Sequence, residues 1–225
     1  MTEQMPGHLR ETAAAYDLVA EDYAALLRDE LAGKPLDRAL LAAFAEAAAQ
    51  FAGAEVADVG CGPGRIAGHL RSLGLTVTGI DLSSEMLKVA RRDHPGIRFQ
   101  QGSMLDLPLP EASLAGVLAW YSIIHLPPAE LPRVFAQFFR VLRPGGQLLL
   151  AFQAGQEKRR ITQAYGHDVA LDAYRLPPDE IEQLLVSAGF GLRASVLRQA
   201  EAWEKTPQAY LLAEKPGRPA QSPVA

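Results

Sequence analysis

The chain has 225 residues, of which 48% are hydrophobic and 21% charged, so it carries enough apolar material for a folded domain and lacks the composition of a disordered protein. Its formal net charge of −4 gives no general attraction to nucleic acid or to an anionic membrane. The single cysteine, Cys61, excludes an internal disulfide and a multi-thiolate metal site; we expect no metal and a reducing, cytoplasmic location. We find no signal-peptide pattern and no apolar run of membrane-spanning length.

Two helices are predicted before the first strand. Apolar residues recur at helical spacing from Glu11 to Leu31, and an Ala-rich helix is expected from Pro35 to Phe51. Gly33 and Pro35 separate the two segments. We interpret residues 1–51 as a helical cap on a single domain of residues 1–215.

Five short apolar runs then alternate with helix-like segments between residues 55 and 153. This alternation predicts an α/β fold with a parallel sheet. Ser83 is expected to cap the helix that follows the second run. The stretch "RPGG", residues 143–146, is expected to end another helix before a strand that starts at Gln147.

The last third is predicted to contain one helix, which ends at Gly189, and two strands, "GLRASVLRQ" and "QAYLLAEK". Residues 216–225 have the composition of a disordered tail. The densest basic cluster, "EKRR" at residues 157–160, is interpreted as a solvent-exposed face.

Three glycines, Gly60, Gly62 and Gly64, lie in the turn between the first strand and the helix after it. Glycine tolerates positive φ there and lets a ligand approach the backbone, although a tight turn needs glycine for geometry alone. Asp81 ends the second strand about 20 residues beyond the first glycine, where a carboxylate can accept hydrogen bonds from ribose hydroxyls. Asp81 could instead cap the next helix, but Ser83 is available for that position. The pair of features predicts a nucleotide-like ligand.

Position 65 narrows the choice of nucleotide. The dinucleotide fingerprint has its third glycine there, whereas this chain has Arg65, which argues against NAD. No G-x-x-x-x-G-K-[ST] motif is present, so a P-loop is excluded.

Four stretches resemble, in order, motifs of the class I S-adenosylmethionine-dependent methyltransferases of the small-molecule type. They are "VADVGCGPGRIAGHL", "VTGIDLSSEMLKVAR", "GSMLDLPLPEASLAGVLAWYSIIHL" and "FRVLRPGGQLLLAF". The resemblance extends from about Tyr16 to Lys215. It implies a Rossmann-like sheet of seven strands in the order 3-2-1-4-5-7-6, with strand 7 antiparallel and helices on both faces. It also implies S-adenosyl-L-methionine as cofactor and S-adenosyl-L-homocysteine as product.

The resemblance also implies which residues hold the cofactor. The turn residues and the strand before them would hold the methionine end, and Asp81 the ribose. Leu82 and Met86 would flank the adenine, and Ser103 with Met104 stands where many relatives have an Asp near the adenine amino group. Tyr16 is expected to cover the cofactor, and Trp120 to contact the cofactor or the acceptor, although core packing is an alternative for both. The implied residues of the methionine end are Asp58, Gly60, Cys61, Gly62 and Gly64, with the Cys61 side chain as a small neutral filler.

Methyl transfer from a sulfonium mainly requires a nucleophile held in line with the methyl group. His125, after the fourth strand, is the candidate base because its pKa is naturally near neutrality; a contact to the cofactor or to the loop is the alternative. Five further side chains are candidates to line the acceptor pocket, although core packing is an alternative for Tyr23 and Tyr121. They are Tyr23, Tyr121, Tyr165, His167 and Tyr174.

We therefore expect a methyltransferase that acts on an O, N or C nucleophile of a small molecule, such as a bacterial secondary metabolite. A nucleic-acid or protein methyltransferase is the first alternative, but the position of the "NPPY"-like motif reads "AWYS" here, residues 119–122. A non-catalytic cofactor-binding scaffold and, more remotely, an NAD-dependent oxidoreductase are the others. The expected partner is the small-molecule acceptor, with no nucleic acid or membrane, and the chain is expected to be a monomer or a homodimer.

Overall fold

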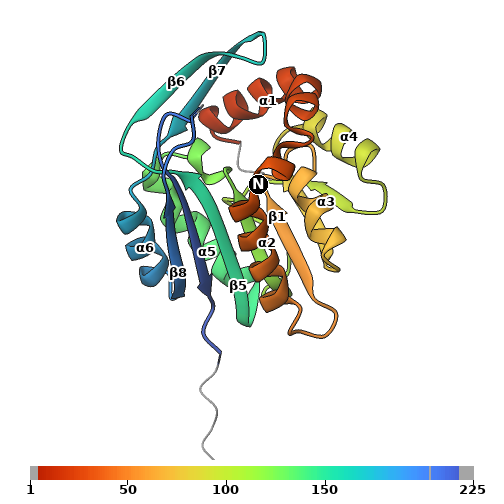
Figure 1. The fold of residues 1–225 in the computed structure, drawn as a ribbon, viewed down its shortest axis with the longest axis vertical. Coiled ribbons are helices and arrows are strands. Elements are labelled where there is room, and N and C mark those ends of the chain that lie inside the picture. Colours follow the sequence, from red (N-terminus) through yellow and green to blue (C-terminus); the bar gives the residue numbers. More distant parts are fainter. Residues whose placement is uncertain (1–4, 203, 218–225) are drawn as a thin grey trace, which may run out of the picture.

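The computed structural model describes residues 5–202 and 204–217, and within them seven strands form one sheet (Figure 1). These strands are β1 (Glu55–Val59), β2 (Thr76–Asp81), β3 (Arg98–Gln101), β4 (Leu114–Trp120), β5 (Leu142–Gln153), β8 (Gly191–Arg198) and β9 (Gln208–Glu214). Their order is β3-β2-β1-β4-β5-β9-β8, and β9 is antiparallel to both of its neighbours. Since β8 and β9 are the sixth and seventh strands of this sheet, the expected order and the antiparallel seventh strand are confirmed.

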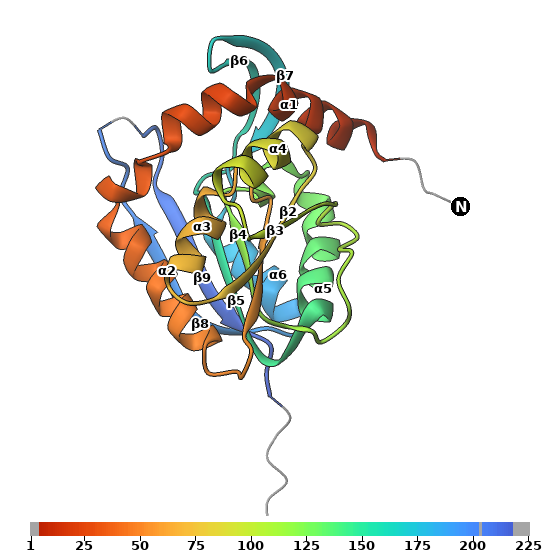
Figure 2. The same ribbon diagram turned by 90° about the vertical axis from the view of Figure 1, so that its right-hand side faces the viewer.

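Helices cover both faces of the sheet, as Figure 2 shows. The helices are α1 (Gly7–Leu27), α2 (Pro35–Ala48), α3 (Arg65–Ser72), α4 (Ser84–Asp93), α5 (Leu131–Val141) and α6 (Pro178–Ser187). Short 3₁₀ segments span Glu30–Gly33, Ile123–His125 and Pro128–Glu130. α2, α3 and α4 pack against one face, and α5 and α6 against the other. α1 crosses above the carboxyl ends of the strands (Figure 1).

The helices are held by apolar stripes at helical spacing. In α5, Val134, Phe135, Phe138 and Val141 are fully buried against the sheet. Burying each such side chain contributes about 1.5–3 kcal/mol, so this stripe fixes the helix that follows β4. The loop between them, which carries His125, is thereby anchored at both ends.

Two predicted boundaries can be compared directly with the structure. Ser83 caps α4, since its Oγ accepts a hydrogen bond from the Met86 amide at 3.0 Å, which confirms that prediction. The predicted start of β5 at Gln147 is wrong, because the strand already begins at Leu142. Leu142 pairs with Leu114, and the pairing register shifts before Gln147 pairs with Gly116; the "RPGG" stretch thus forms an irregularity inside β5.

A hairpin that was not predicted, β6 (Lys158–Ala164) and β7 (His167–Tyr174), forms a separate two-stranded sheet. It projects at the top of the molecule beside α1 (Figure 1). Tyr165 and Gly166 join the strands with φ of 52° and 82°, as a two-residue hairpin turn requires. β6 was missed because it is largely polar and lacks the alternation typical of a half-buried strand.

Of the predicted tail, the structure describes residues 216 and 217, and residues 218–225 lie outside the described part of the chain. Across residues 5–202 and 204–217, no helix combines the length and the apolar character needed to cross a membrane.

Candidate functional site

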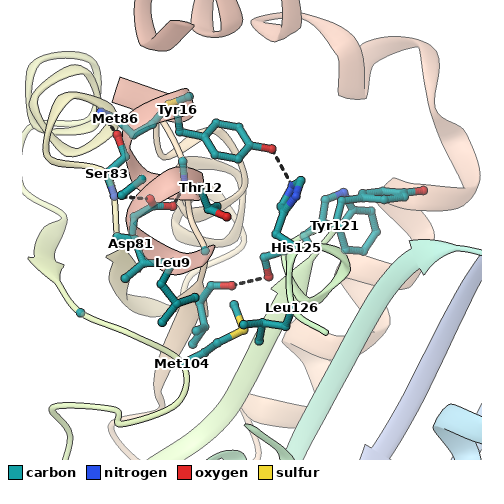
Figure 3. A pocket seen from close by; sticks show the side chains of 18 of the residues that line it. Leu9, Thr12, Tyr16, Asp81, Ser83, Met86, Met104, Tyr121, His125 and Leu126 are labelled. Atoms are coloured by element: carbon teal, nitrogen blue, oxygen red, sulfur yellow. Dashed lines mark hydrogen bonds between the residues drawn. The ribbon is translucent and has the colours of Figure 1, made fainter. Parts of the chain in front are cut away.

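A cavity, here called the donor pocket, lies between α1 and the carboxyl ends of β1, β2 and β4 (Figure 3). Its empty volume is about 720 Å³, including the part open to solvent. Eight of the expected cofactor residues line it, together with His125, Tyr23 and Tyr121. These eight are Tyr16, Gly60, Gly62, Asp81, Leu82, Met86, Met104 and Trp120.

The glycine turn is shaped by close contacts on two sides and by open space on a third. Gly60 has a φ of 78°, and a Cβ there would lie 2.2 Å from the Cβ of Ser122. A Cβ on Gly64 would lie 2.8 Å from the ring of Phe99. A Cβ on Gly62 would meet only Tyr23, at 4.0 Å, so this glycine leaves room for a ligand on the cavity side.

Asp81 ties the glycine turn to the end of β2. Its Oδ2 accepts a hydrogen bond from the Gly62 amide at 2.8 Å, and its Oδ1 accepts one from the Ser83 amide at 2.9 Å. Burial raises the pKa of this carboxyl, and the backbone hydrogen bonds oppose that shift. Each carboxylate oxygen can accept a further bond, so this role and ribose binding are compatible.

Asp17 of α1 is a structural residue that the sequence reasoning did not single out. Its Oδ1 accepts hydrogen bonds from the Ser83 hydroxyl at 2.6 Å and from the Glu85 amide at 3.0 Å. This carboxylate therefore joins α1 to the first turn of α4, where negative charge is favourable. The one sequence signal that could have identified Asp17 is its position directly after Tyr16.

Asp58 is buried behind the turn, 1% exposed, and does not belong to the residues that line the donor pocket. Within the described residues neither of its carboxylate oxygens has a hydrogen-bond partner. Burial raises its pKa to about 7, the charge of Asp81 adds to the shift, and the charge of Arg65 opposes it. An unpartnered buried carboxyl at this position fits a cationic group in the turn.

Three other expected cofactor residues, Cys61, Gly64 and Ser103, do not line the donor pocket. The Cys61 side chain is buried, and burial raises the pKa of its thiol. Gly64 precedes α3 with a φ of 81°. Ser103 lies in the loop after β3, where its Oγ accepts a hydrogen bond from the Leu105 amide at 3.1 Å.

A second, larger cavity adjoins the donor pocket, and we call it the acceptor cavity because the methyl acceptor is expected there. It has an empty volume of about 1430 Å³, including open solvent, and lies between α1, the β6–β7 hairpin and the ends of β5 and β9. Of the residues expected there, Tyr23, Tyr121 and Tyr165 line it. Five residues line both cavities: Tyr16, Tyr23, Trp120, Tyr121 and His125.

His125 lies at this shared wall with both ring nitrogens engaged, and Figure 3 shows its bond to Tyr16. Its Nδ1 is 3.0 Å from the backbone oxygen of Asp172 and must donate to it, so Nε2 accepts the Tyr16 hydroxyl at 2.7 Å. Burial lowers the pKa of His125, which keeps the ring neutral at pH 7. The lone pair of Nε2 is therefore bonded to the hydroxyl of Tyr16, a residue that lines both cavities.

A second polar chain begins at the same wall. Tyr121, whose φ is 55°, has its hydroxyl 3.3 Å from that of Tyr210, and the Tyr210 hydroxyl donates to Asp37 Oδ1 at 2.9 Å. Burial raises the pKa of Asp37. Asp37 was not expected from the sequence, because a single Asp on an amphipathic helix carries no pattern that marks it.

His167 and Tyr174 lie outside the acceptor cavity as the structure describes it. His167 is at the base of the hairpin turn, where its Nε2 is 2.7 Å from Asp22 Oδ2. Tyr174 faces a small hollow beside His8, and its ring lies 5.6 Å from Lys158 Nζ. Strand alternation turns Tyr174 away from the cavity, which its neighbour Ala173 lines instead, whereas His167 stands at the first position of β7 and is held by its contact with Asp22 of α1.

Comparison with known proteins places this architecture among methyltransferases. The model of a methyltransferase domain family matches residues 56–146. An uncharacterised methyltransferase of Geobacillus kaustophilus is 31% identical over 171 residues, which cover 72% of this chain and 76% of that protein. A malonyl-[acyl-carrier protein] O-methyltransferase of Pectobacterium atrosepticum is 35% identical over 114 residues, which cover 50% of this chain and 44% of the relative. The chain thus spans about half the length of several curated relatives that it matches.

Solved structures share the fold over nearly the whole chain. The [4+2]-cyclase SpnF superposes with a TM-score of 0.72 at 19% identity, covering 94% of this chain and 98% of its own. The DhpI–SAH complex has a TM-score of 0.69 at 21% identity with the same coverage. The glycine turn, the open face of Gly62 and the unpartnered carboxyl of Asp58 fit the amino-acid end of S-adenosylmethionine, the methyl donor of this family. By its sequence and its fold, the chain belongs to the class I S-adenosylmethionine-dependent methyltransferases.

Proposed function

We propose that this protein transfers the methyl group of S-adenosylmethionine to a small molecule by in-line displacement. The observation that carries this proposal is the shared wall of the two cavities, formed by Tyr16, Tyr23, Trp120, Tyr121 and His125. Because the same five side chains line both cavities, a donor bound in one cavity and an acceptor bound in the other would approach each other beside them. Holding two reactants in line can account for about 7–11 kcal/mol of barrier lowering.

The chain's own residues would hold the donor, and the bound sulfonium supplies an electrophilic methyl group. Gly62 leaves space for the methionine portion, and Asp58 supplies a negative charge behind the turn. Asp81 would accept the ribose hydroxyls with its remaining lone pairs, and Leu82 and Met86 would flank the adenine. α1 covers the pocket and excludes water.

His125 is proposed as the proton acceptor when the nucleophile arrives protonated. The neutral ring has its acceptor nitrogen bonded to the Tyr16 hydroxyl, so a proton from the acceptor would pass through Tyr16 to Nε2. The hydrogen bond from Nδ1 to Asp172 fixes the tautomer that this transfer needs. The alternative role is positioning α1, since the same bond joins α1 to the loop after β4.

The proposed class of methyl acceptor rests on the names of the relatives. Several relatives are named O-methyltransferases, including one of Pyrenophora dematioidea at 29% identity over 147 residues. These names favour an oxygen nucleophile for this chain as well. The small molecule that carries it would be either free or bound to a carrier protein. A bacterial, cytoplasmic enzyme that is a monomer or a homodimer remains part of the proposal, and the single buried thiol of Cys61 supports a reducing location.

The test combines binding with turnover. We expect S-adenosylhomocysteine to bind in calorimetry, and methyl transfer from labelled S-adenosylmethionine to appear with at least one member of a broad panel of small phenols, carboxylic acids and amines. Tight binding without turnover would favour the cofactor-binding scaffold, or another reaction on the same fold such as the one for which SpnF is named. A salt-sensitive affinity for RNA or DNA would favour the nucleic-acid alternative.

A further inference from the structure

The basic cluster on β6 divides between two sides of the strand. Lys158 and Arg160 both pair with Asp172 of β7, at 2.8 Å and 3.0 Å, on the outer side of the hairpin. Arg159, the residue between them, is half-buried and lines the acceptor cavity. The interpretation of the whole cluster as a solvent-exposed face is therefore wrong for Arg159, because successive side chains of a strand point to opposite sides.

Arg159 differs from the other cations of the cavity wall in having no counter-ion. Lys34 pairs with Glu201 and Glu204, at 2.7 Å and 3.1 Å. Arg65 pairs with Glu30 at 3.0 Å, and Arg198 pairs with Glu204 at 2.7 Å. The guanidinium of Arg159 makes no ion pair or hydrogen bond with any of the residues that the structure describes.

One carboxyl of the same wall, Asp37, also lacks a direct ion pair, but its surroundings already compensate its charge. It is 5% exposed and accepts the Tyr210 hydroxyl. Arg198 and Lys34 lie close enough to lower the pKa of Asp37 against the effect of burial. The positive charge that is left without compensation is therefore the guanidinium of Arg159.

We propose that the methyl acceptor carries an oxyanion, a carboxylate or a phosphate, which Arg159 binds through its planar fork of N–H donors. A guanidinium matches both groups with two parallel hydrogen bonds. The rest of the cavity wall near the hairpin is apolar or aromatic, with Ile161 and Leu171 beside Tyr23 and Tyr165, and it suits an apolar or aromatic body. The nucleophile then lies toward the wall shared with the donor pocket. This inference rests on the proposed function, because it identifies the acceptor of that same site.

The experiment measures binding without turnover, on the protein loaded with S-adenosylhomocysteine. Four probes share one aromatic ring and differ in charge or anion: benzoate, benzamide, benzylamine and phenyl phosphate. Calorimetry is expected to show benzoate or phenyl phosphate binding at least about tenfold more tightly than benzamide, a difference of about 1.4 kcal/mol. Whichever of the two anions binds more tightly identifies the oxyanion.

Matched variants locate the effect. In Arg159→Gln the advantage of the anion over benzamide is expected to disappear, and in Arg159→Lys it is expected to be reduced but retained. Arg160→Gln, the neighbouring arginine on the outer side, is expected to leave the advantage unchanged. Unaltered affinity for S-adenosylhomocysteine in each variant shows that the fold and the donor pocket are intact.

Several results would overturn the inference. These are equal binding of anions and benzamide, no binding of either anion, tighter binding of benzylamine, or an anion advantage that survives in Arg159→Gln. Failure of the proposed function is a different result, namely loss of S-adenosylhomocysteine binding or absence of methyl transfer while the anions still bind.

Discussion

The donor pocket and the acceptor cavity share a wall but are built in different ways. Apart from α1, the donor pocket is assembled from strand ends and loops between Val59 and Leu126, where parallel strands bring their carboxyl ends together. The acceptor cavity draws on α1, α2, the β6–β7 hairpin and the start of β9, segments that are far apart in the sequence. Local backbone rules therefore determine the first, and long-range packing determines the second.

Hydrogen bonding shows the same difference. In the donor pocket, backbone amides of Gly62 and Ser83 hold Asp81 in a fixed position. In the acceptor cavity, ion pairs join side chains of different elements, such as Arg65 of α3 with Glu30. We expect changes in the first region to affect cofactor binding and changes in the second to affect acceptor selection, and the following variants test that division.

The largest effect is expected for Gly60→Ala. The added Cβ would overlap Ser122 at 2.2 Å and hold a side chain at a φ of 78°, so we expect a loss of about 2–4 kcal/mol in the free energy of unfolding and no measurable cofactor binding. Urea unfolding and calorimetry with S-adenosylhomocysteine measure both. Gly33→Ala is the control, because a Cβ there meets nothing within 4 Å. Wild-type cofactor affinity in Gly60→Ala would contradict the tight turn.

His125→Asn comes next. If His125 accepts the proton, kcat is expected to fall about 100-fold while the affinity for S-adenosylhomocysteine stays within about threefold. Because burial lowers the pKa of His125, the wild-type rate should decline only below the ordinary histidine value of 6.5, and the variant should lack that decline. Equal losses of turnover and cofactor affinity would assign His125 to positioning α1.

Asp81→Ala tests the acidic residue at the end of β2. The substitution removes an acceptor from the Gly62 amide and from the proposed ribose site, and hydrogen bonds to a charged group contribute about 1.5–3 kcal/mol each. We expect affinity for S-adenosylhomocysteine to fall at least about tenfold in calorimetry. Asp106→Ala, an exposed carboxylate in the loop after β3, is expected to bind normally. Unchanged affinity in Asp81→Ala would remove that residue from the ribose role.

A smaller effect is expected for Tyr165→Ala, at the hairpin turn. Its ring lies edge-on to Tyr23 at 5.2 Å, and such pairs contribute about 0.5–1.5 kcal/mol. The KM for the acceptor should rise about threefold to tenfold, with cofactor affinity unchanged. His167→Ala, which removes only a surface pair with Asp22, should change neither value.

The smallest effect concerns stability against pH. The folded state keeps His125 neutral, whereas the unfolded chain takes up a proton at the ordinary value of 6.5, so unfolding is favoured as the pH falls below that value and until the lowered native pKa is reached. His69 and His94, whose pKa values burial also lowers, add to the same slope. Urea unfolding from pH 7 to pH 5 should show this slope, and His125→Asn should reduce it. An unchanged slope would indicate that His125 titrates alike in both states.

The parts that could be predicted follow short-range rules. The glycine turn, Asp81 and the Ser83 cap depend on residues that are close in sequence, whereas the order of the seven strands was implied by the resemblance to a known family. The hairpin was missed because β6 is polar, and with it the position of Arg159. Asp17 and Asp37 were missed because each acts on a distant element, Asp17 on α4 and Asp37 on Tyr210 of β9. The positions of His167 and Tyr174 could not be predicted, because the register of the hairpin determines which side they occupy and the hairpin itself was missed.

Gly60 and Ser122 are 62 residues apart in the sequence, but the Ser122 side chain occupies the space into which a side chain at position 60 would extend. Ser122 donates its hydroxyl to the Val59 carbonyl at 2.7 Å and already fills the space that any side chain at position 60 would need. A smaller residue at position 122 would not by itself admit a side chain at position 60, because a φ of 78° disfavours residues other than glycine there. We therefore expect position 122 to accept other small residues, whereas a substitution at position 60 should be poorly tolerated whatever stands at position 122.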